Sequence, residues 1–135
     1  MRFPHLLLYL TILALANFMN NKGKQAENAA LEWLIRQQLI LLENNYSCRF
    51  GEIDLIMLDH ETLVFIEVRQ RSNSKFGGAA DSVTPKKQQK IITTAKHFLM
   101  RHAKYNQHFC RFDVLAFESN TAQCQPVWYK DAFRL

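Results

Sequence analysis

The chain has 135 residues, of which 48% are hydrophobic and 21% are charged, with only 4 Gly and 3 Pro. This composition predicts one compact domain with a hydrophobic core, and it excludes a disordered, collagen-like or low-complexity chain. The formal net charge of +5 favours an anionic partner, and three widely spaced cysteines without a C-x-x-C motif favour a reducing compartment such as the cytoplasm.

Residues 6–18 form an apolar segment, LLLYLTILALANF, that is shorter than the roughly 20 apolar residues of a membrane-spanning helix. We therefore expect no stable membrane span. A start codon assigned too early, with Met19 as the true initiator, is the preferred explanation. A secretory signal and a helix packed on the domain stay open as alternatives. The expected organisation is an extension over residues 1–18 and a single domain over residues 19–135.

Two helices are predicted. The first covers residues 21–38, where apolar residues recur at a spacing of three to four and Asn20 or Asn21 is available as a cap. The second begins at Thr84-Pro85, with Thr as N-cap and Pro at the first helical position. Its apolar stripe extends to Leu99.

Runs rich in apolar and β-branched residues predict the strands. Asn44-Asn45 and residues 59–61 are expected to be turns, and residues 72–82 a loop. The order α-β-β-β-α-β predicts an α/β domain with a mixed sheet. The predicted strands cover residues 39–42, 49–58, 62–71, 111–117 and, more briefly, 127–129.

Acidic and basic residues fall in two adjacent blocks. Residues 51–68 contain five acids and no Lys or Arg, whereas residues 69–111 contain ten cations against Asp81 alone. A basic block of this kind is typical of contacts with a phosphate backbone, although an ordinary solvated helix face would also explain it. The candidate nucleic-acid contacts are Arg71, Lys86, Lys87, Lys90 and Arg101.

Asp54 and Glu67 lie on the two strands of a predicted hairpin. If the hairpin is symmetric about its turn, these two acids face each other, where like charges are destabilising and require a cation. One candidate is a divalent metal held by oxygen ligands, Mg²⁺ or Mn²⁺, which activates water and neutralises a phosphate. The other is a structural ion-pair cluster with Arg69, Arg71 or Arg111.

Several short motifs resemble the bacterial family called YraN, in order and spacing, from about residue 20 to residue 117. The motifs are GKQAE (23–27), GEIDLI (51–56), VFIEVRQR (64–71), FG (76–77), the Lys86-Lys87 helix start and RFDV (111–114). That family is similar to the restriction-endonuclease-like superfamily, and most of all to archaeal Holliday-junction resolvases. The resemblance implies a restriction endonuclease-like fold, with a mixed central β-sheet flanked by helices.

The resemblance also implies an active site. Superfamily sites combine a helix Glu, a strand Asp and an acid-x-Lys motif, which correspond here to Glu27, Asp54, Glu67 and Arg69. It implies that Asp54 and Glu67 bind the metal, that Glu27 contacts it directly or through water, and that the carbonyl of Val68 completes the shell. Arg69 departs from the usual Lys. Because its guanidinium stays protonated, Arg69 can stabilise a phosphate but is a poor base.

These observations lead us to expect a cytoplasmic, nuclease-like domain over residues 19–135. It is expected to bind branched or double-stranded nucleic acid, DNA in preference to RNA, with Mg²⁺- or Mn²⁺-dependent phosphodiester cleavage as the candidate activity. A non-catalytic nucleic-acid-binding module of the same fold, with structural carboxylates, stays open, as does a secreted protein if residues 1–18 are used. A resolvase-like protein that acts on two strands is expected to be a two-fold homodimer.

Overall fold

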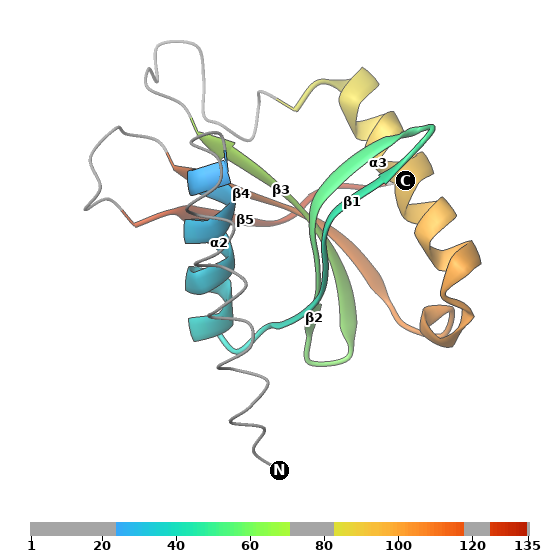
Figure 1. The fold of residues 1–135 in the computed structure, drawn as a ribbon, viewed down its shortest axis with the longest axis horizontal. Helices are drawn as coiled ribbons and strands as arrows, with labels where there is room; N and C mark the ends of the chain where they lie inside the picture. The colour runs from blue at the N-terminus through green and yellow to red at the C-terminus, as the bar shows by residue number, and fades with distance from the viewer. Residues whose placement is uncertain (1–23, 71–82, 118–124, 135) are drawn as a thin grey trace.

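The computed structural model of the chain describes residues 24–70, 83–117 and 125–134. The predicted extension over residues 1–18, Arg71 and the predicted loop over residues 72–82 lie outside the described residues. The elements follow in chain order (Figure 1): α2 (Gln25–Arg36), β1 (Ile40–Cys48), β2 (Gly51–Asp59), β3 (Thr62–Gln70), α3 (Pro85–Arg101), the 3₁₀ helix η3 (Ala103–Tyr105), β4 (Cys110–Phe117) and β5 (Val127–Phe133).

The strands form one five-stranded mixed sheet in the order β1-β2-β3-β4-β5. All neighbours pair antiparallel except β3 and β4, which are parallel. Parallel neighbours require a crossover connection, and α3 lies in that connection. The predicted α/β class, with a mixed central sheet flanked by helices, is confirmed, and the architecture is consistent with a restriction endonuclease-like fold.

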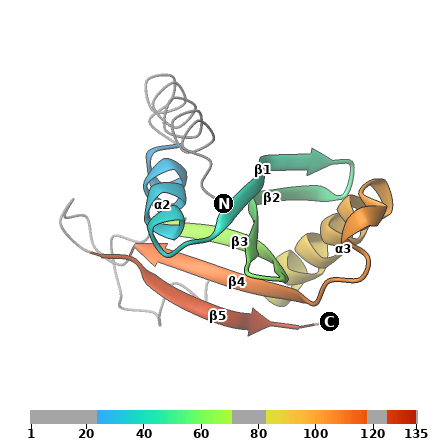
Figure 2. The same ribbon diagram turned by 90° about the horizontal axis from the view of Figure 1, so that it is seen from below.

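The two helices cover opposite faces of the sheet (Figure 2). Successive side chains of β3 alternate between these faces, as a strand requires. Val64 and Ile66 belong to the core cluster beneath α2, and Leu63 and Phe65 belong to the cluster beneath α3. Within the described part of the chain, neither helix is long and apolar enough to cross a membrane.

The predicted start of the second helix is confirmed. Pro85 is its first residue, and the Thr84 side chain accepts a hydrogen bond from the Lys87 amide at 3.2 Å. This bond satisfies one of the amides that a helix N-terminus leaves without a partner. The start of α3 is thereby fixed by local sequence, which matters because three lysines follow it directly.

The predicted turn at Asn44-Asn45 is wrong. Both residues lie inside β1, which extends to Cys48, and the chain reverses at Arg49 and Phe50 instead. Asn45 has a φ of 53°, a conformation that Asn tolerates better than most residues, and the pairing with β2 shifts register nearby. The asparagines therefore accommodate an irregularity within a strand and do not end it.

The β2–β3 hairpin has the predicted symmetric register. Asp59 pairs with Thr62 across the turn, and the ladder continues to Leu55 opposite Ile66. It ends there, one position before the two acids that the sequence placed opposite each other. The strands therefore separate where Asp54 and Glu67 are located.

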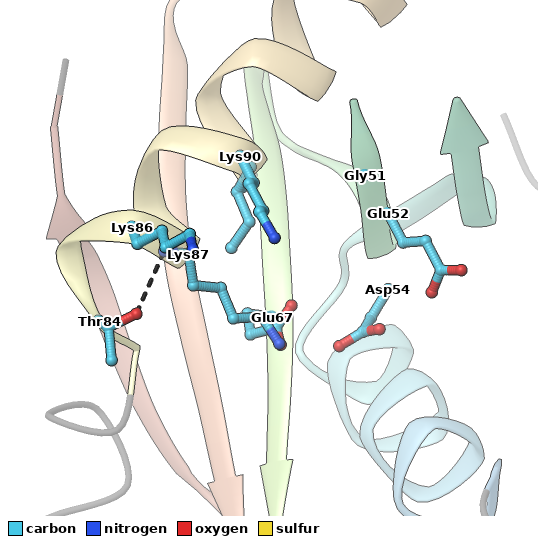
Figure 3. Close-up of a pocket in the computed structure, with 9 residues that line it drawn as sticks. Gly51, Glu52, Asp54, Glu67, Thr84, Lys86, Lys87 and Lys90 are labelled. Carbon is cyan, nitrogen blue, oxygen red and sulfur yellow. Dashed lines mark hydrogen bonds and ion pairs between the residues drawn. The ribbon is translucent and has the colours of Figure 1, made fainter. Parts of the chain in front are cut away.

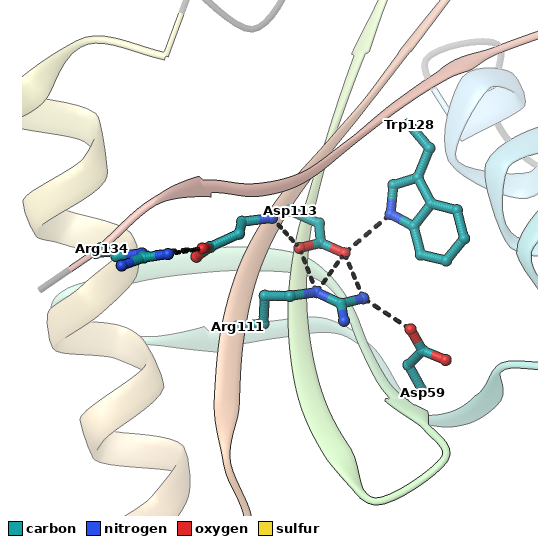
Figure 4. Close-up of polar contacts among 6 residues, drawn as sticks. Asp59, Arg111, Asp113, Trp128 and Arg134 are labelled. Atoms are coloured by element: carbon teal, nitrogen blue, oxygen red, sulfur yellow. Dashed lines mark hydrogen bonds and ion pairs between the residues drawn. The ribbon is translucent and has the colours of Figure 1, made fainter.

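A buried ionic network holds β4 and β5 to the β2–β3 turn (Figure 4). The carboxylate of Asp113 is fully buried and accepts hydrogen bonds from the Arg111 side chain, from Trp128 Nε1 and from the Asp131 amide, each at 2.9 Å. Arg111 also donates to Asp59 Oδ2 at 2.9 Å. This network gives Asp113 a structural role and engages Arg111 with Asp59 and Asp113, not with Asp54 or Glu67.

We predict that Asp113→Ala destabilises the chain by about 3–5 kcal/mol, because it leaves the half-buried Arg111 guanidinium and the Trp128 indole without their acceptor. Urea denaturation followed by circular dichroism measures the change. Glu61→Ala, in the exposed hairpin turn, serves as the control and should change stability little. A loss below about 1 kcal/mol in Asp113→Ala contradicts a structural role for this network.

Candidate functional site

A pocket of about 420 Å³ opens between the start of α3 and the diverging ends of β2 and β3. Figure 3 shows the carboxylates of Asp54 and Glu67 on its sheet side and lysine side chains on its helix side. The structure thus brings together two of the four predicted metal ligands, Asp54 and Glu67, and three of the predicted phosphate contacts. The lining residues are Gly51, Glu52, Asp54, Glu67, Thr84, Lys86, Lys87, Lys90 and Ile91.

Glu67 is buried, with only 7% of its side chain exposed. Its Oε1 lies 2.8 Å from Lys87 Nζ and 3.5 Å from Arg69 Nε. Burial, together with the nearby charge of Asp54, nevertheless raises the pKa of Glu67 to about 7. Lys87 and Arg69 lower it, but they offset only part of this rise. The ionised form of Glu67 is therefore incompletely compensated by the protein itself.

Asp54 takes the place of a backbone partner at the end of the β2–β3 ladder. Its Oδ2 accepts a hydrogen bond from the Val68 amide at 2.8 Å. Burial raises the pKa of Asp54 to about 6, and the charge of Glu27 acts in the same direction, while the Val68 amide opposes the shift. Among the described residues, Asp54 forms no ion pair.

Glu27 lies in the first turn of α2, close enough to act on Asp54 through its charge, but it does not line the pocket. With its amide nitrogen turned toward Glu27, Asn45 donates to Glu27 Oε2 at 2.8 Å and accepts from Lys24 Nζ at 3.1 Å. This contact ties the start of α2 to β1. The structure therefore places Glu27 near Asp54 but outside the pocket lining.

The donor set fits a hard divalent cation. No cluster of three or more His, Cys, Asp or Glu side chains able to hold a metal occurs among the described residues, so a cation here would depend on Asp54 and Glu67. Mg²⁺ typically binds through one or two carboxylates, waters and substrate phosphates. The Val68 N–H faces β2, and in an extended strand the carbonyl of the same residue points the same way, so a backbone oxygen is also within this region.

Lysines lie at the start of α3, where the helix dipole disfavours positive charge. The first turn contains no acid, although negative charge is favoured at a helix N-terminus. Lys87 is explained by its ion pair with Glu67, which sequence reasoning missed because it assigned Lys87 to nucleic acid alone. The unfavourable position of a cation at this helix end was the available signal that an anion lies opposite.

One of the predicted nucleic-acid contacts that the structure describes, Arg101, is not in the pocket. Arg101 is at the far end of α3, about 22 Å along the helix axis from Lys86, where it lines a separate pocket with His97 and His102. Arg71 lies outside the described residues. Lys86 and Lys90 line the pocket and form no ion pair among the described residues.

Comparison with known proteins identifies relatives over most of the chain. The model of a family described as "Uncharacterised protein family UPF0102" matches residues 26–117. A "UPF0102 protein" of Psychromonas ingrahamii is 53% identical over 115 residues, which cover 85% of this chain and 91% of the relative. One of Nitrosomonas eutropha is 51% identical over 114 residues, covering 84% and 93%, and one of Alcanivorax borkumensis is 48% identical over 114 residues, covering 84% and 91%.

Without divalent metal, we expect the free energy of unfolding to fall as the pH rises from about 4.5 to 7. The native Glu67 carboxyl keeps its proton in this range, whereas the unfolded chain has lost it, so stability is greatest below the unfolded pKa. Glu67→Gln should remove much of this loss. At pH 8, its free energy of unfolding should exceed that of the parent chain by on the order of 2 kcal/mol.

Urea denaturation at pH 5, 6, 7 and 8 in the presence of a chelator measures this dependence. Glu61→Gln, an exposed acid in the hairpin turn, should follow the parent chain at every pH. If the free energy of unfolding depends on pH in the same way for Glu67→Gln and for the parent chain, the charge of Glu67 is adequately compensated by Lys87 and Arg69.

Proposed function

The chain belongs to the uncharacterised protein family UPF0102, the YraN family that its motifs resemble, and we propose that it is a nuclease-like protein that binds nucleic acid and cleaves phosphodiester bonds with Mg²⁺ or Mn²⁺. The observation that carries this proposal is a pair of incompletely compensated carboxylates, Glu67 buried and Asp54 half-buried, that share a pocket with three lysines. Branched or duplex DNA is the proposed substrate. The proposed location is the cytoplasm, and a two-fold homodimer stays a prediction.

The charges of the pocket suit phosphodiester chemistry. A divalent metal, when bound, neutralises charge on the phosphate and lowers the pKa of water. Asp54 and Glu67 supply the oxygen ligands, and Lys86 and Lys90 hold phosphate oxygens at the pocket wall. These roles require nothing from residues outside the pocket.

Arg69 and Lys87 position and stabilise the reacting groups. The buried Nε of Arg69 makes no hydrogen bond among the described residues and lies 3.5 Å from Glu67 Oε1, so Arg69 places a second cation beside this carboxylate. Since the guanidinium stays protonated, Arg69 accepts no proton. Lys87 fixes the orientation of Glu67 through its 2.8 Å contact.

A second candidate function is a non-catalytic nucleic-acid-binding module. The observation that favours it is the same Lys87–Glu67 ion pair, which supplies one of the two acids with a cation from the protein itself. Arg69 at the position of the superfamily Lys points the same way. The two candidates share the basic pocket wall and differ only in whether the acids bind a metal that acts on the phosphate.

Cleavage assays distinguish these two functions. The full chain is incubated with four-way junction, duplex and single-stranded DNA, and with RNA, in Mg²⁺, Mn²⁺ or a chelator. We expect metal-dependent cleavage that falls at least roughly 100-fold in Asp54→Asn and Glu67→Gln, because each replaces a charged carboxylate ligand of the metal with a neutral amide. Glu61→Gln, an exposed acid of the same charge, is the matched control. Cleavage that survives in the Asp54→Asn, Glu67→Gln double variant contradicts the proposal, and binding without any cleavage favours the non-catalytic module.

Salt dependence tests the basic wall of the pocket. Each lysine that contacts a phosphate contributes about 0.9 to the slope of log affinity against log salt on duplex DNA. We therefore expect the Lys86→Ala, Lys90→Ala double variant to reduce the slope by about 2 when affinity is measured by fluorescence anisotropy. Lys96→Ala, on the same helix but outside the pocket, should leave it unchanged. An unaltered slope in the double variant would mean that these lysines are only solvated.

A further inference from the structure

The pocket that contains Asp54 and Glu67 is called the acid pocket below. A second pocket, of about 380 Å³, adjoins it along α3. Its lining residues are Phe50, Lys86, Gln89, Lys90 and Thr93. Lys86 and Lys90 belong to both pockets, so the two share a wall. The new feature is the aromatic ring of Phe50, which is 39% exposed at the turn between β1 and β2.

The β1–β2 turn that carries this ring lies beside α3 (Figure 1). Gly51, the next residue, has a φ of +149°, and a Cβ atom there would lie 3.2 Å from Thr94 Oγ1 and 3.7 Å from the Lys90 Cβ. Only glycine allows so close an approach with this backbone conformation. The ring also meets the His97 ring edge-on, with centroids 6.2 Å apart. The backbone beside the ring is therefore held close to α3, and the ring itself contacts His97.

Positive charge surrounds the exposed ring. The Arg49 guanidinium lies over it at 4.7 Å from the centroid, and Lys86 and Lys90 line the adjoining wall. Arg49, Lys86 and Lys90 are all exposed, and none forms an ion pair with another described residue. A single exposed aromatic residue is ordinary on a protein surface, but a ring among unpaired cations matches the combination that binds a base and its phosphates.

We propose that Phe50 is a stacking platform for an unpaired nucleobase, and that the acid pocket therefore acts on strands with unpaired nucleotides beside the bound phosphate. This inference rests on the proposed function of the acid pocket. Bases within a continuous duplex are already stacked on their neighbours and present only their edges, so a side chain can stack only on a base outside the duplex. Stacking on an aromatic ring is sequence-tolerant, because every base has a π-face. Single strands, junctions and flaps offer such bases, whereas a perfect duplex does not.

Binding measurements in a chelator test this inference without requiring cleavage. The full chain and its variants are titrated with fluorescent single-stranded DNA, single-stranded RNA, a four-way junction and a perfect duplex. We expect Phe50→Ala and Phe50→Leu to weaken binding of the single strands and the junction by about 5- to 100-fold, and that of the duplex by less than about 2-fold. Phe50→Tyr keeps an aromatic face and should restore the affinity.

Phe109→Ala is the matched control, since Phe109 is 85% exposed but lines a different pocket on the far side of the sheet from β1. It should change no affinity. Thermal melting of each variant verifies that Phe50→Leu, which retains an apolar side chain at the turn, is folded. A loss confined to DNA or to RNA strands would identify which of the two provides the base.

Two results overturn the inference while leaving the proposed function intact. One is unchanged binding of single strands and junctions by Phe50→Ala and Phe50→Leu. The other is an equal loss on every substrate, duplex included, which would mean that Phe50 only supports the position of Lys86 and Lys90. If the parent chain binds no nucleic acid at low salt, the proposed function fails together with the stacking platform.

Discussion

The placement of a buried and a half-buried carboxylate at the end of one ladder is the constraint on which the rest of this site depends. Asp54 replaces a backbone acceptor for Val68 at the position where β2 and β3 separate, and Glu67 lies on the neighbouring strand with almost no exposure. Burying like charges side by side is costly, and the raised pKa values of both acids measure that cost. Arg69 of the same hairpin lies 3.5 Å from Glu67, and Lys87 of α3 supplies a closer cation at 2.8 Å.

The topology explains why the cation comes from α3. Because β3 and β4 are parallel, the chain must return from the carboxyl end of β3 to the start of β4, where Cys110 lies opposite Leu63. The crossover helix therefore begins beside Glu67, near the carboxyl end of β3, and ends near the opposite edge. Lys86, Lys87 and Lys90 are thereby brought to the acids, and Arg101 is carried away from them. Ligand sites in open α/β sheets commonly lie at the carboxyl ends of strands for this reason.

Local signals in the sequence predicted a large part of this arrangement. The His60-Glu61 turn predicts the register that places Asp54 near Glu67, and Thr84-Pro85 predicts where α3 begins. Asn44-Asn45 misled because positive φ is shared by turns and by irregular strands. The Lys87–Glu67 ion pair and the position of Phe50 against α3 depend on packing between segments more than 15 residues apart, which periodicity alone cannot encode. The ion pair of Asp113, by contrast, is local in sequence, because its partner Arg111 is two residues away on the same strand.

The charge balance of the pocket implies that its two proposed ligands depend on each other. Three lysines face three acids across the pocket, so the wall carries little net charge when all are ionised. A phosphate that enters alone is repelled by the carboxylates, and a divalent cation that enters alone is repelled by the lysines. Each ligand relieves the repulsion that opposes the other, and because such coupling is reciprocal in free energy, each should strengthen the binding of the other. The acids and the basic helix are separate blocks in the sequence. In the structure they form one site, in which the negative charges of the acids and the positive charges of the lysines nearly cancel.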